Sequence, residues 1–171
     1  LDIVEADQEN KVYWYENDGT PGDGTWSQTK IKGGLGAALA VAIADIDNDG
    51  DLDVVSVAYT GNKVSWHLND GSPDGAVWTT YTIATPTKPT SVFPADIDYD
   101  GDIDIASCAE TGTQSNGKVR WYVNDGTPDA GWTTNNIASS INRPSSVFVA
   151  DIDSDGKLDL VSAAYAGDEI A

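Results

Sequence analysis

Three copies of one acidic motif hold half of the carboxylates in this sequence, the side chains most able to bind a metal ion. The motif is D-x-D-x-D-G-x-x-D, and its copies begin at Asp45, Asp96 and Asp151. Hard cations such as Ca²⁺ bind roughly six to eight oxygen atoms, and carboxylates at alternating positions of a tight loop can supply several of them. We therefore expect three calcium-binding loops.

Each expected site combines carboxylates with one backbone carbonyl. The Gly at position 6 permits the sharp turn that brings positions 1, 3, 5 and 9 together. Position 7 is Lys in the third copy, and an ammonium group cannot coordinate a cation, so the carbonyl is the expected ligand there. The predicted metal-site residues are Asp45, Asp47, Asp49, Asp51 and Asp53, then Asp96, Asp98, Asp100, Asp102 and Asp104, then Asp151, Asp153, Asp155, Lys157 and Asp159.

The residues around these loops predict β-hairpins and not the helix–loop–helix unit of an EF-hand. An EF-hand loop needs Glu at position 12, which here is Ser56, Ser107 and Ser162. Short runs rich in β-branched residues stand on both sides of each loop, at 40–44 and 52–57 for the first. We expect each loop to join two neighbouring strands.

A longer repeat surrounds the metal loops. Lys-Val-x-Trp precedes three Asn-Asp-Gly turns and places Trp14, Trp66 and Trp121 at equivalent positions. A period of about fifty residues with several strands per unit is typical of propeller-type arrays. Each unit reads as four strands. In the third strand, Trp66 is expected to pack while His67 lies on a wetter face.

The repeat predicts an all-β fold: a β-propeller segment of four-stranded blades, with about three and a quarter repeats. The predicted boundaries divide one region, 1–171, into a partial blade 1–36, a blade 37–87, a blade 88–142 and a partial blade 143–171. Because the chain enters and leaves in mid-repeat, open strand edges would be exposed. We expect further chain, or other copies of this chain, to complete the propeller.

Composition narrows the range of partners. The formal net charge is −19, which disfavours nucleic acids and anionic membrane surfaces as partners. No apolar run approaches the ~20 residues of a membrane span. Cys108 is the single cysteine, so no disulfide forms within the chain, and we expect a small buried thiol.

The metal loop followed by a strand and by Lys-Val-x-Trp-Tyr-x-Asn-Asp-Gly resembles the FG-GAP or VCBS repeat, a family that includes the integrin α-subunit propeller. The resemblance spans essentially the whole chain and implies a propeller of about seven blades. It also implies Ca²⁺ in the loop between the first two strands of each blade, held by the residues named above. The Phe-Gly and Gly-Ala-Pro elements are weak here, which places the chain nearer the VCBS branch.

We predict no enzyme activity. His67 is the sole histidine and replaces Tyr15 and Tyr122 of the other repeats, so an aromatic stand-in is favoured over a general base. Calcium loops without a bidentate Glu fill at extracellular calcium levels. We expect an extracellular or cell-surface module for adhesion, protein–protein interaction or surface assembly, whose partner is an extracellular protein or a glycan. The alternatives are a carbohydrate-binding lectin of the same fold, and a non-catalytic scaffold region of a larger secreted enzyme.

Overall fold

The computed structural model describes residues 1–20, 22, 24–72, 78–112 and 116–165. Within these ranges the chain forms thirteen β-strands and no helix, so no helix there could span a membrane. The strands are β1 (Ile3–Asp7), β2 (Lys11–Glu16), β3 (Ser27–Gly33), β4 (Ala38–Ala44), β5 (Asp53–Ala58), β6 (Lys63–Leu68), β7 (Thr79–Ala84), β8 (Pro89–Ala95), β9 (Asp104–Ala109), β10 (Gly117–Val123), β11 (Thr133–Ile141), β12 (Pro144–Ala150) and β13 (Asp159–Ala164).

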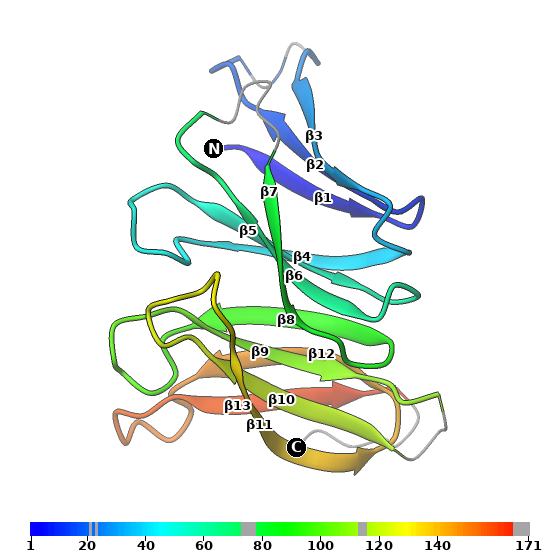
Figure 1. The fold of residues 1–171 in the computed structure, drawn as a ribbon, viewed down its shortest axis with the longest axis vertical. Helices are drawn as coiled ribbons and strands as arrows, with labels where there is room; N and C mark the ends of the chain where they lie inside the picture. Colours follow the sequence, from blue (N-terminus) through cyan, green and yellow to red (C-terminus); the bar gives the residue numbers. More distant parts are fainter. Residues whose placement is uncertain (21, 23, 73–77, 113–115, 166–171) are drawn as a thin grey trace.

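The strands form four antiparallel sheets that follow one another along the chain. Their strand orders are β1-β2-β3, β4-β5-β6-β7, β8-β9-β10-β11 and β12-β13. In Figure 1 the first sheet lies at the top, the second in the middle and the last two at the bottom, and the array is open. The predicted all-β fold, a propeller segment of four-stranded blades, is confirmed. The blade boundaries remain a prediction.

The predicted hairpins are present in all three repeats. Each metal loop joins a sheet's first strand to its second, as residues 45–52 join β4 to β5. In the third sheet, the fourth strand β11 has nine residues, against seven in β3 and six in β7. Two register shifts, between Gly117 and Lys118 and between Val119 and Arg120, accompany this longer pairing. The spacing from Lys63 to Lys118 exceeds that from Lys11 to Lys63, which predicts an insertion at 113–116, largely outside the described residues.

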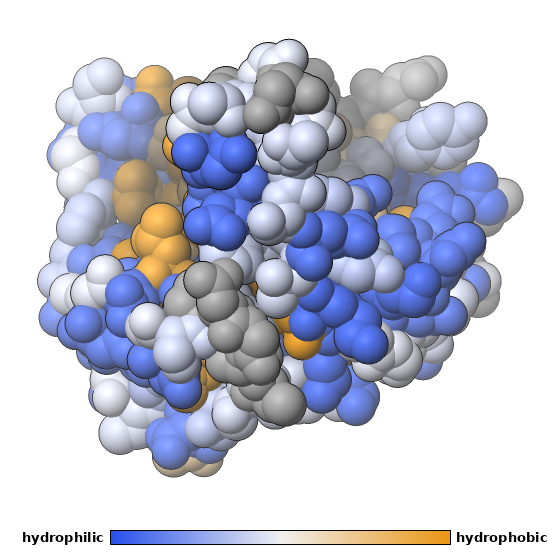
Figure 2. Space-filling model, turned by 90° about the horizontal axis from the view of Figure 1, so that it is seen from above, coloured by the Kyte–Doolittle hydropathy of each residue, from blue (hydrophilic) through white to orange (hydrophobic). Residues whose placement is uncertain are grey.

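The core lies between successive sheets. The first strand of each sheet packs on the preceding sheet, so β8 contacts both β4 and β5. Trp66 is buried there and stacks on Tyr81 with 4.7 Å between ring centroids. Cys108 is a buried free thiol, as expected. Full burial of each large apolar side chain contributes about 1.5–3 kcal/mol. The face of the molecule seen in Figure 2 is mostly hydrophilic, with small hydrophobic areas between polar residues.

The prediction that His67 lies on a wetter face is wrong. The side chain is fully buried, because neighbouring sheets cover both faces of β4–β7. Its Nε2 lies 2.8 Å from Ser56 Oγ and its Nδ1 lies 3.0 Å from Thr80 Oγ1. In the next sheet, Ser107 Oγ donates to the equivalent Tyr122 hydroxyl at 3.3 Å. His67 is therefore an aromatic stand-in that links three strands.

This burial predicts an acid-sensitive step in stability. Burial, with a smaller contribution from the charge of Lys32, lowers the pKa of His67 to about 3. An unfolded histidine titrates near 6.5, so between these values only the unfolded chain binds the proton. Stability is therefore lost as pH falls below about 6.5, by up to about 1.4 kcal/mol per pH unit.

His67→Tyr, which copies Tyr122, should remove this loss. Denaturant unfolding of both proteins at pH 7.5 and pH 5.0 gives the comparison, in which the carboxylates common to the two proteins cancel. We expect the wild type to lose more stability on acidification than the variant. Equal losses would show that the histidine does not titrate on unfolding.

Candidate metal centres

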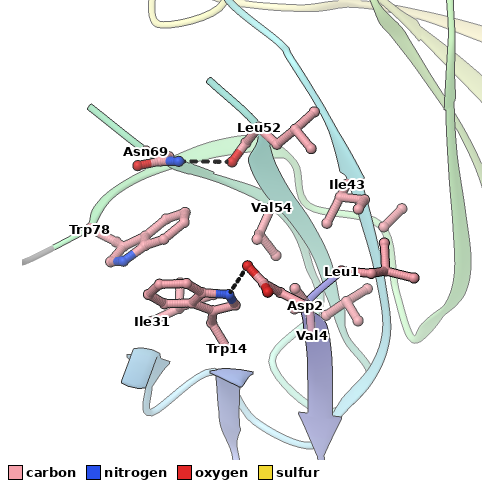
Figure 3. Close-up of a pocket in the computed structure, with 12 residues that line it drawn as sticks. Leu1, Asp2, Val4, Trp14, Ile31, Ile43, Leu52, Val54, Asn69 and Trp78 are labelled. Carbon is pink, nitrogen blue, oxygen red and sulfur yellow. Dashed lines mark hydrogen bonds between the residues drawn. The ribbon is translucent and has the colours of Figure 1, made fainter. Parts of the chain in front are cut away.

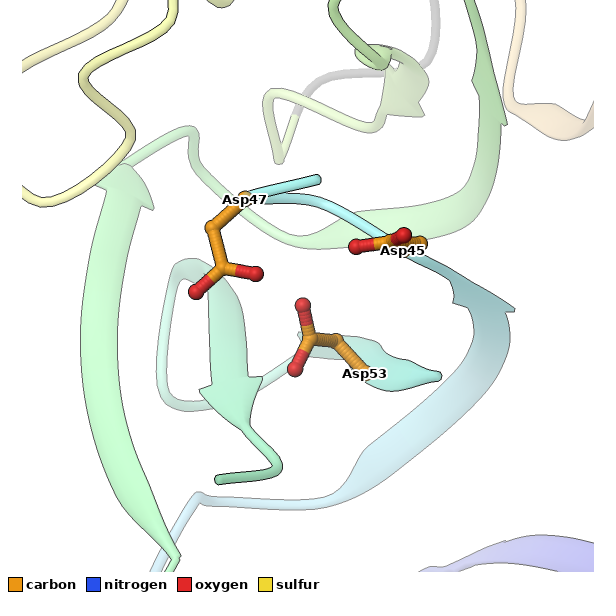
Figure 4. Close-up of side chains that lie close together, drawn as sticks. All are labelled: Asp45, Asp47 and Asp53. Atoms are coloured by element: carbon orange, nitrogen blue, oxygen red, sulfur yellow. The ribbon is translucent and has the colours of Figure 1, made fainter. Parts of the chain in front are cut away.

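Three aspartates meet in each of the three loops. In the first loop, carboxylate oxygens of Asp45, Asp47 and Asp53 all lie within 4.8 Å of one another. Figure 4 shows these carboxylates directed toward one common space, with Asp53 arriving from β5. The same grouping recurs as Asp96, Asp98 and Asp104, and as Asp151, Asp153 and Asp159. Positions 1, 3 and 9 of the motif are thus brought together, as the spacing predicted.

The backbone of the loop is curled around the carboxylate at position 1. Asp45 Oδ1 accepts from the Asp49 amide at 3.1 Å, and its Oδ2 accepts from the Gly50 amide at 3.0 Å. Gly50 has φ of 97°, and Asn48 at position 4 has φ of 60°. The left-handed conformation is ordinary for Gly and tolerated by Asn. These bonds give the turn its shape.

Position 5 lies outside the groups of three in the described structure. Asp49 Oδ1 accepts from the Asp51 amide at 2.9 Å, and Asp100 Oδ1 accepts from the Asp102 amide at 2.9 Å. Asp155 bonds the Lys157 amide at 2.8 Å in the same way. Asp49 and Asp100 each keep a second oxygen, whereas Asp155 Oδ2 lies 3.4 Å from Lys157 Nζ. The three residues remain predicted ligands.

The side chains at position 7 point away from the groups of three. The Asp51 carboxylate lies so close to Gly71 that a Cβ there would come within 2.7 Å of Oδ2. Asp102 lies against Gly126 in the same way. Lys157 Nζ contacts Asp155 Oδ2 at 3.4 Å. The position-7 carbonyls therefore remain predicted ligands.

The aspartate at position 9 is held by two backbone amides. Asp53 is fully buried, and its Oδ2 accepts from Ile46 N at 3.1 Å while its Oδ1 accepts from Asn69 N at 2.7 Å. Burial outweighs these bonds and raises the pKa of Asp53 to about 6. Burial likewise raises the pKa of Asp104. Both carboxylates are positioned precisely but are costly to ionise without a cation.

The asparagine of each Asn-Asp-Gly turn is a supporting residue that the sequence analysis missed. Asn69 donates through Nδ2 to Leu52 O at 3.1 Å, in addition to its amide bond with Asp53. Asn124 donates to Ile103 O at 3.3 Å and to Ile46 O of the preceding loop at 3.0 Å. The recurrence of Asn in every copy was the available signal, but it was interpreted only as turn chemistry.

Residues at position 4 connect one loop to the next. Asn48 Nδ2 donates to Asp102 Oδ1 at 2.8 Å, across the boundary between two sheets. Tyr99, the equivalent residue of the second loop, has its pKa raised first by burial and then by the charges of Asp151 and Asp155 in the third loop. The first two loops are therefore joined by a side-chain hydrogen bond, and the third lies close enough for its charges to act on Tyr99.

A fourth position-9 carboxylate belongs to the first sheet. Asp2 accepts from Trp14 Nε1 at 3.2 Å and from Asn17 N at 3.0 Å. It lies at an apolar pocket of about 510 Å³ between the first two sheets, which Trp78 also lines (Figure 3). Between the second and third sheets, the loop residue Ile46 packs in the core.

The donor set fits a hard divalent cation. The atoms that converge in each group are carboxylate oxygens, with no sulfur or nitrogen donor among them. In the first loop, burial first and then the charge of Asp49 raise the pKa of Asp47. A cation bound among the carboxylates of this loop would offset the repulsion between their negative charges.

The raised pKa of Asp53 predicts proton competition with calcium. Below about pH 6 the metal-free site holds a proton that Ca²⁺ must displace. We expect the apparent calcium affinity to fall as pH decreases from 7 to 5, by up to about tenfold per pH unit for each proton displaced. Calcium titrations at constant ionic strength measure this. An affinity that does not change down to pH 5 would contradict it.

Comparison with known proteins identifies the repeat. A model of the FG-GAP-like repeat matches at residues 1–56, 45–107 and 108–162, and each match contains at least one complete metal loop. No curated protein matched the chain significantly. The three matches together cover most of the sequence and agree with the recurring hairpins and acidic loops. The chain belongs to the FG-GAP-like repeat family.

Proposed function

We propose that this chain is a non-catalytic, calcium-stabilised propeller module that acts in adhesion, protein interaction or surface assembly outside the cell. The observation that carries the proposal is the convergence of three aspartates in each of three loops. Every such loop joins the first two strands of a sheet, where a bound cation stabilises the hairpin. Carboxylates at positions 1, 3 and 9 would hold Ca²⁺, with the position-7 carbonyl and position 5 as further ligands.

Calcium would stabilise contacts between sheets as well as single hairpins. The cation neutralises Asp45 and Asp47, and the carbonyl of Ile46 between them accepts a hydrogen bond from Asn124 Nδ2 of the next sheet. Asp102 is bonded to Asn48 of the preceding loop. Ordering one loop therefore orders the surface on which the next sheet packs. Because the loops of a rigid array are already ordered, binding a partner would cost them little further conformational entropy.

The extracellular assignment rests on calcium supply and on the family. Loops of this type without a bidentate Glu fill at about 10⁻⁴–10⁻³ M calcium, which is an extracellular concentration. The non-catalytic assignment rests on the family, which is generally non-enzymatic. It also rests on the complete burial of His67 between sheets. The role of scaffold within a larger secreted enzyme would use the same calcium-held structure.

A matched pair of variants in the second loop tests the calcium sites. Asp98→Asn removes one charge from a converging carboxylate, whereas Asp102→Asn removes one charge from a side chain directed at Gly126. The Asn introduced at position 102 can still accept the bond from Asn48. If the charge alone matters, the two variants should behave alike. If coordination matters, only the Asp98 variant should respond less to calcium.

Thermal melts with saturating calcium and with excess chelator provide the measurement. A site held at about a hundred times its Kd adds about 2.7 kcal/mol of stability. We expect the wild type and the Asp102 variant to gain stability in calcium, and the Asp98 variant to lose a large part of that gain. In chelator all three should melt at similar temperatures. A wild type that gains nothing from calcium would overturn the proposal.

A further inference from the structure

A second kind of site lies between the second and third sheets, separate from the metal loops. It is a cleft of about 260 Å³ formed by the end of β7, the residues that follow it, and the outer strands β10 and β11. The residues that matter here are Ala84, Thr85, Lys118, Arg120, Thr134 and Asn136. The cleft is smaller than the roughly 300–1,000 Å³ typical of drug-sized ligands and suits a smaller polar molecule.

The charge of this cleft is opposite to that of the chain. The protein carries a net charge of −19, yet the cleft is lined by two cationic side chains and no carboxylate. The flanking stretches 79–95 and 130–150 contain no Asp or Glu. Among the described residues, neither Lys118 nor Arg120 forms an ion pair. Two cations in a cleft without carboxylates attract an anion, whereas the acidic remainder of the surface repels one.

Polar groups surround the two cations. Lys118 and Arg120 are two residues apart on β10, so both project from one face of the strand. Arg120 Nε donates to Asn136 Oδ1 at 3.2 Å, which steadies the guanidinium and leaves its terminal N–H groups for a ligand. The hydroxyls of Thr85 and Thr134 complete a lining that can exchange hydrogen bonds with hydroxyl groups.

The cleft occurs where the repeat departs from its own pattern. By repeat spacing, Arg120 corresponds to Ser65, and Ala84 corresponds to Lys32 of the first repeat. Lys32 lies near enough to His67, in the earlier interface, for its charge to lower that pKa. In the later interface the shorter Ala84 lines the cleft, and Arg120 adds a charge. Two substitutions together create a cationic cleft at one interface only.

We propose that this cleft binds a sugar residue that carries a carboxylate or a sulfate group. Guanidinium and ammonium groups form strong charge-assisted bonds to both anions, and the threonine and asparagine side chains match sugar hydroxyls. The proposal rests on the proposed function in treating the chain as a binding module, and it names a glycan class for that module. It involves none of the metal-loop residues.

Binding to the calcium-loaded full chain tests the proposal. The probes are sodium glucuronate and glucose 6-sulfate, with glucose as the neutral control and sodium sulfate as the simple anion. The variant Arg120→Ser introduces the serine that the second repeat has at the equivalent position, Ser65. Lys63→Gln is the matched control, because it removes an equivalent cation at the start of β6 that does not line the cleft.

We expect at least one acidic sugar to bind the wild type and Lys63→Gln with equal affinity. The same sugar should bind Arg120→Ser with an affinity lower by about tenfold or more. Glucose and sulfate alone should bind much more weakly than that sugar. Failure of both acidic sugars to bind, equal binding to all three proteins, or preferential binding of bare sulfate would each overturn the proposal. A calcium melt of the same samples reports separately on the metal sites, so the two failures are distinguishable.

Discussion

The constraint on which this structure depends is the repulsion among carboxylates gathered in its loops. Asp53 and Asp104 are buried at the start of inner strands, where ionisation without a cation is unfavourable. Each nevertheless accepts two backbone hydrogen bonds, one from its own loop and one from the following Asn-Asp-Gly turn. The chain therefore holds a geometry that becomes fully favourable when a cation is present.

Hydrogen bonds between neighbouring loops and sheets extend the effect of this repulsion along the array. Asn124 bonds the carbonyl of Ile46, and Ile46 is fully buried in the core between two sheets. The equivalent Ile152 of the last loop is 58% exposed, because no further sheet covers it in the described part of the chain. The same motif thus gives a core residue or a surface residue according to whether a neighbouring sheet follows, as in other repeat arrays whose stability is shared between neighbours.

The repeat pattern made the fold and the converging aspartates predictable, because strand alternation and metal spacing are local properties of sequence. Positions 1, 3 and 9 meet as expected, but the hydrogen bond that Asp49 accepts from the Asp51 amide of the same loop depends on backbone detail. The burial of His67 was missed because alternation describes one sheet, and a second sheet covers its other face. The cleft at Arg120 could not be predicted, because it depends on Ala84, which is distant in sequence and adjacent only after packing.

The folded repeat also separates its charges. Every metal loop lies at one end of a hairpin, while the third strands begin at the opposite end with Lys11, Lys63 and Lys118. The converging aspartates therefore concentrate negative charge on one side of the array, and their field falls off with distance and salt. A cationic cleft can persist on a strongly acidic protein only far from those loops. Lys118 pairs with Ala109, at the end of β9 remote from Asp104, which meets that requirement.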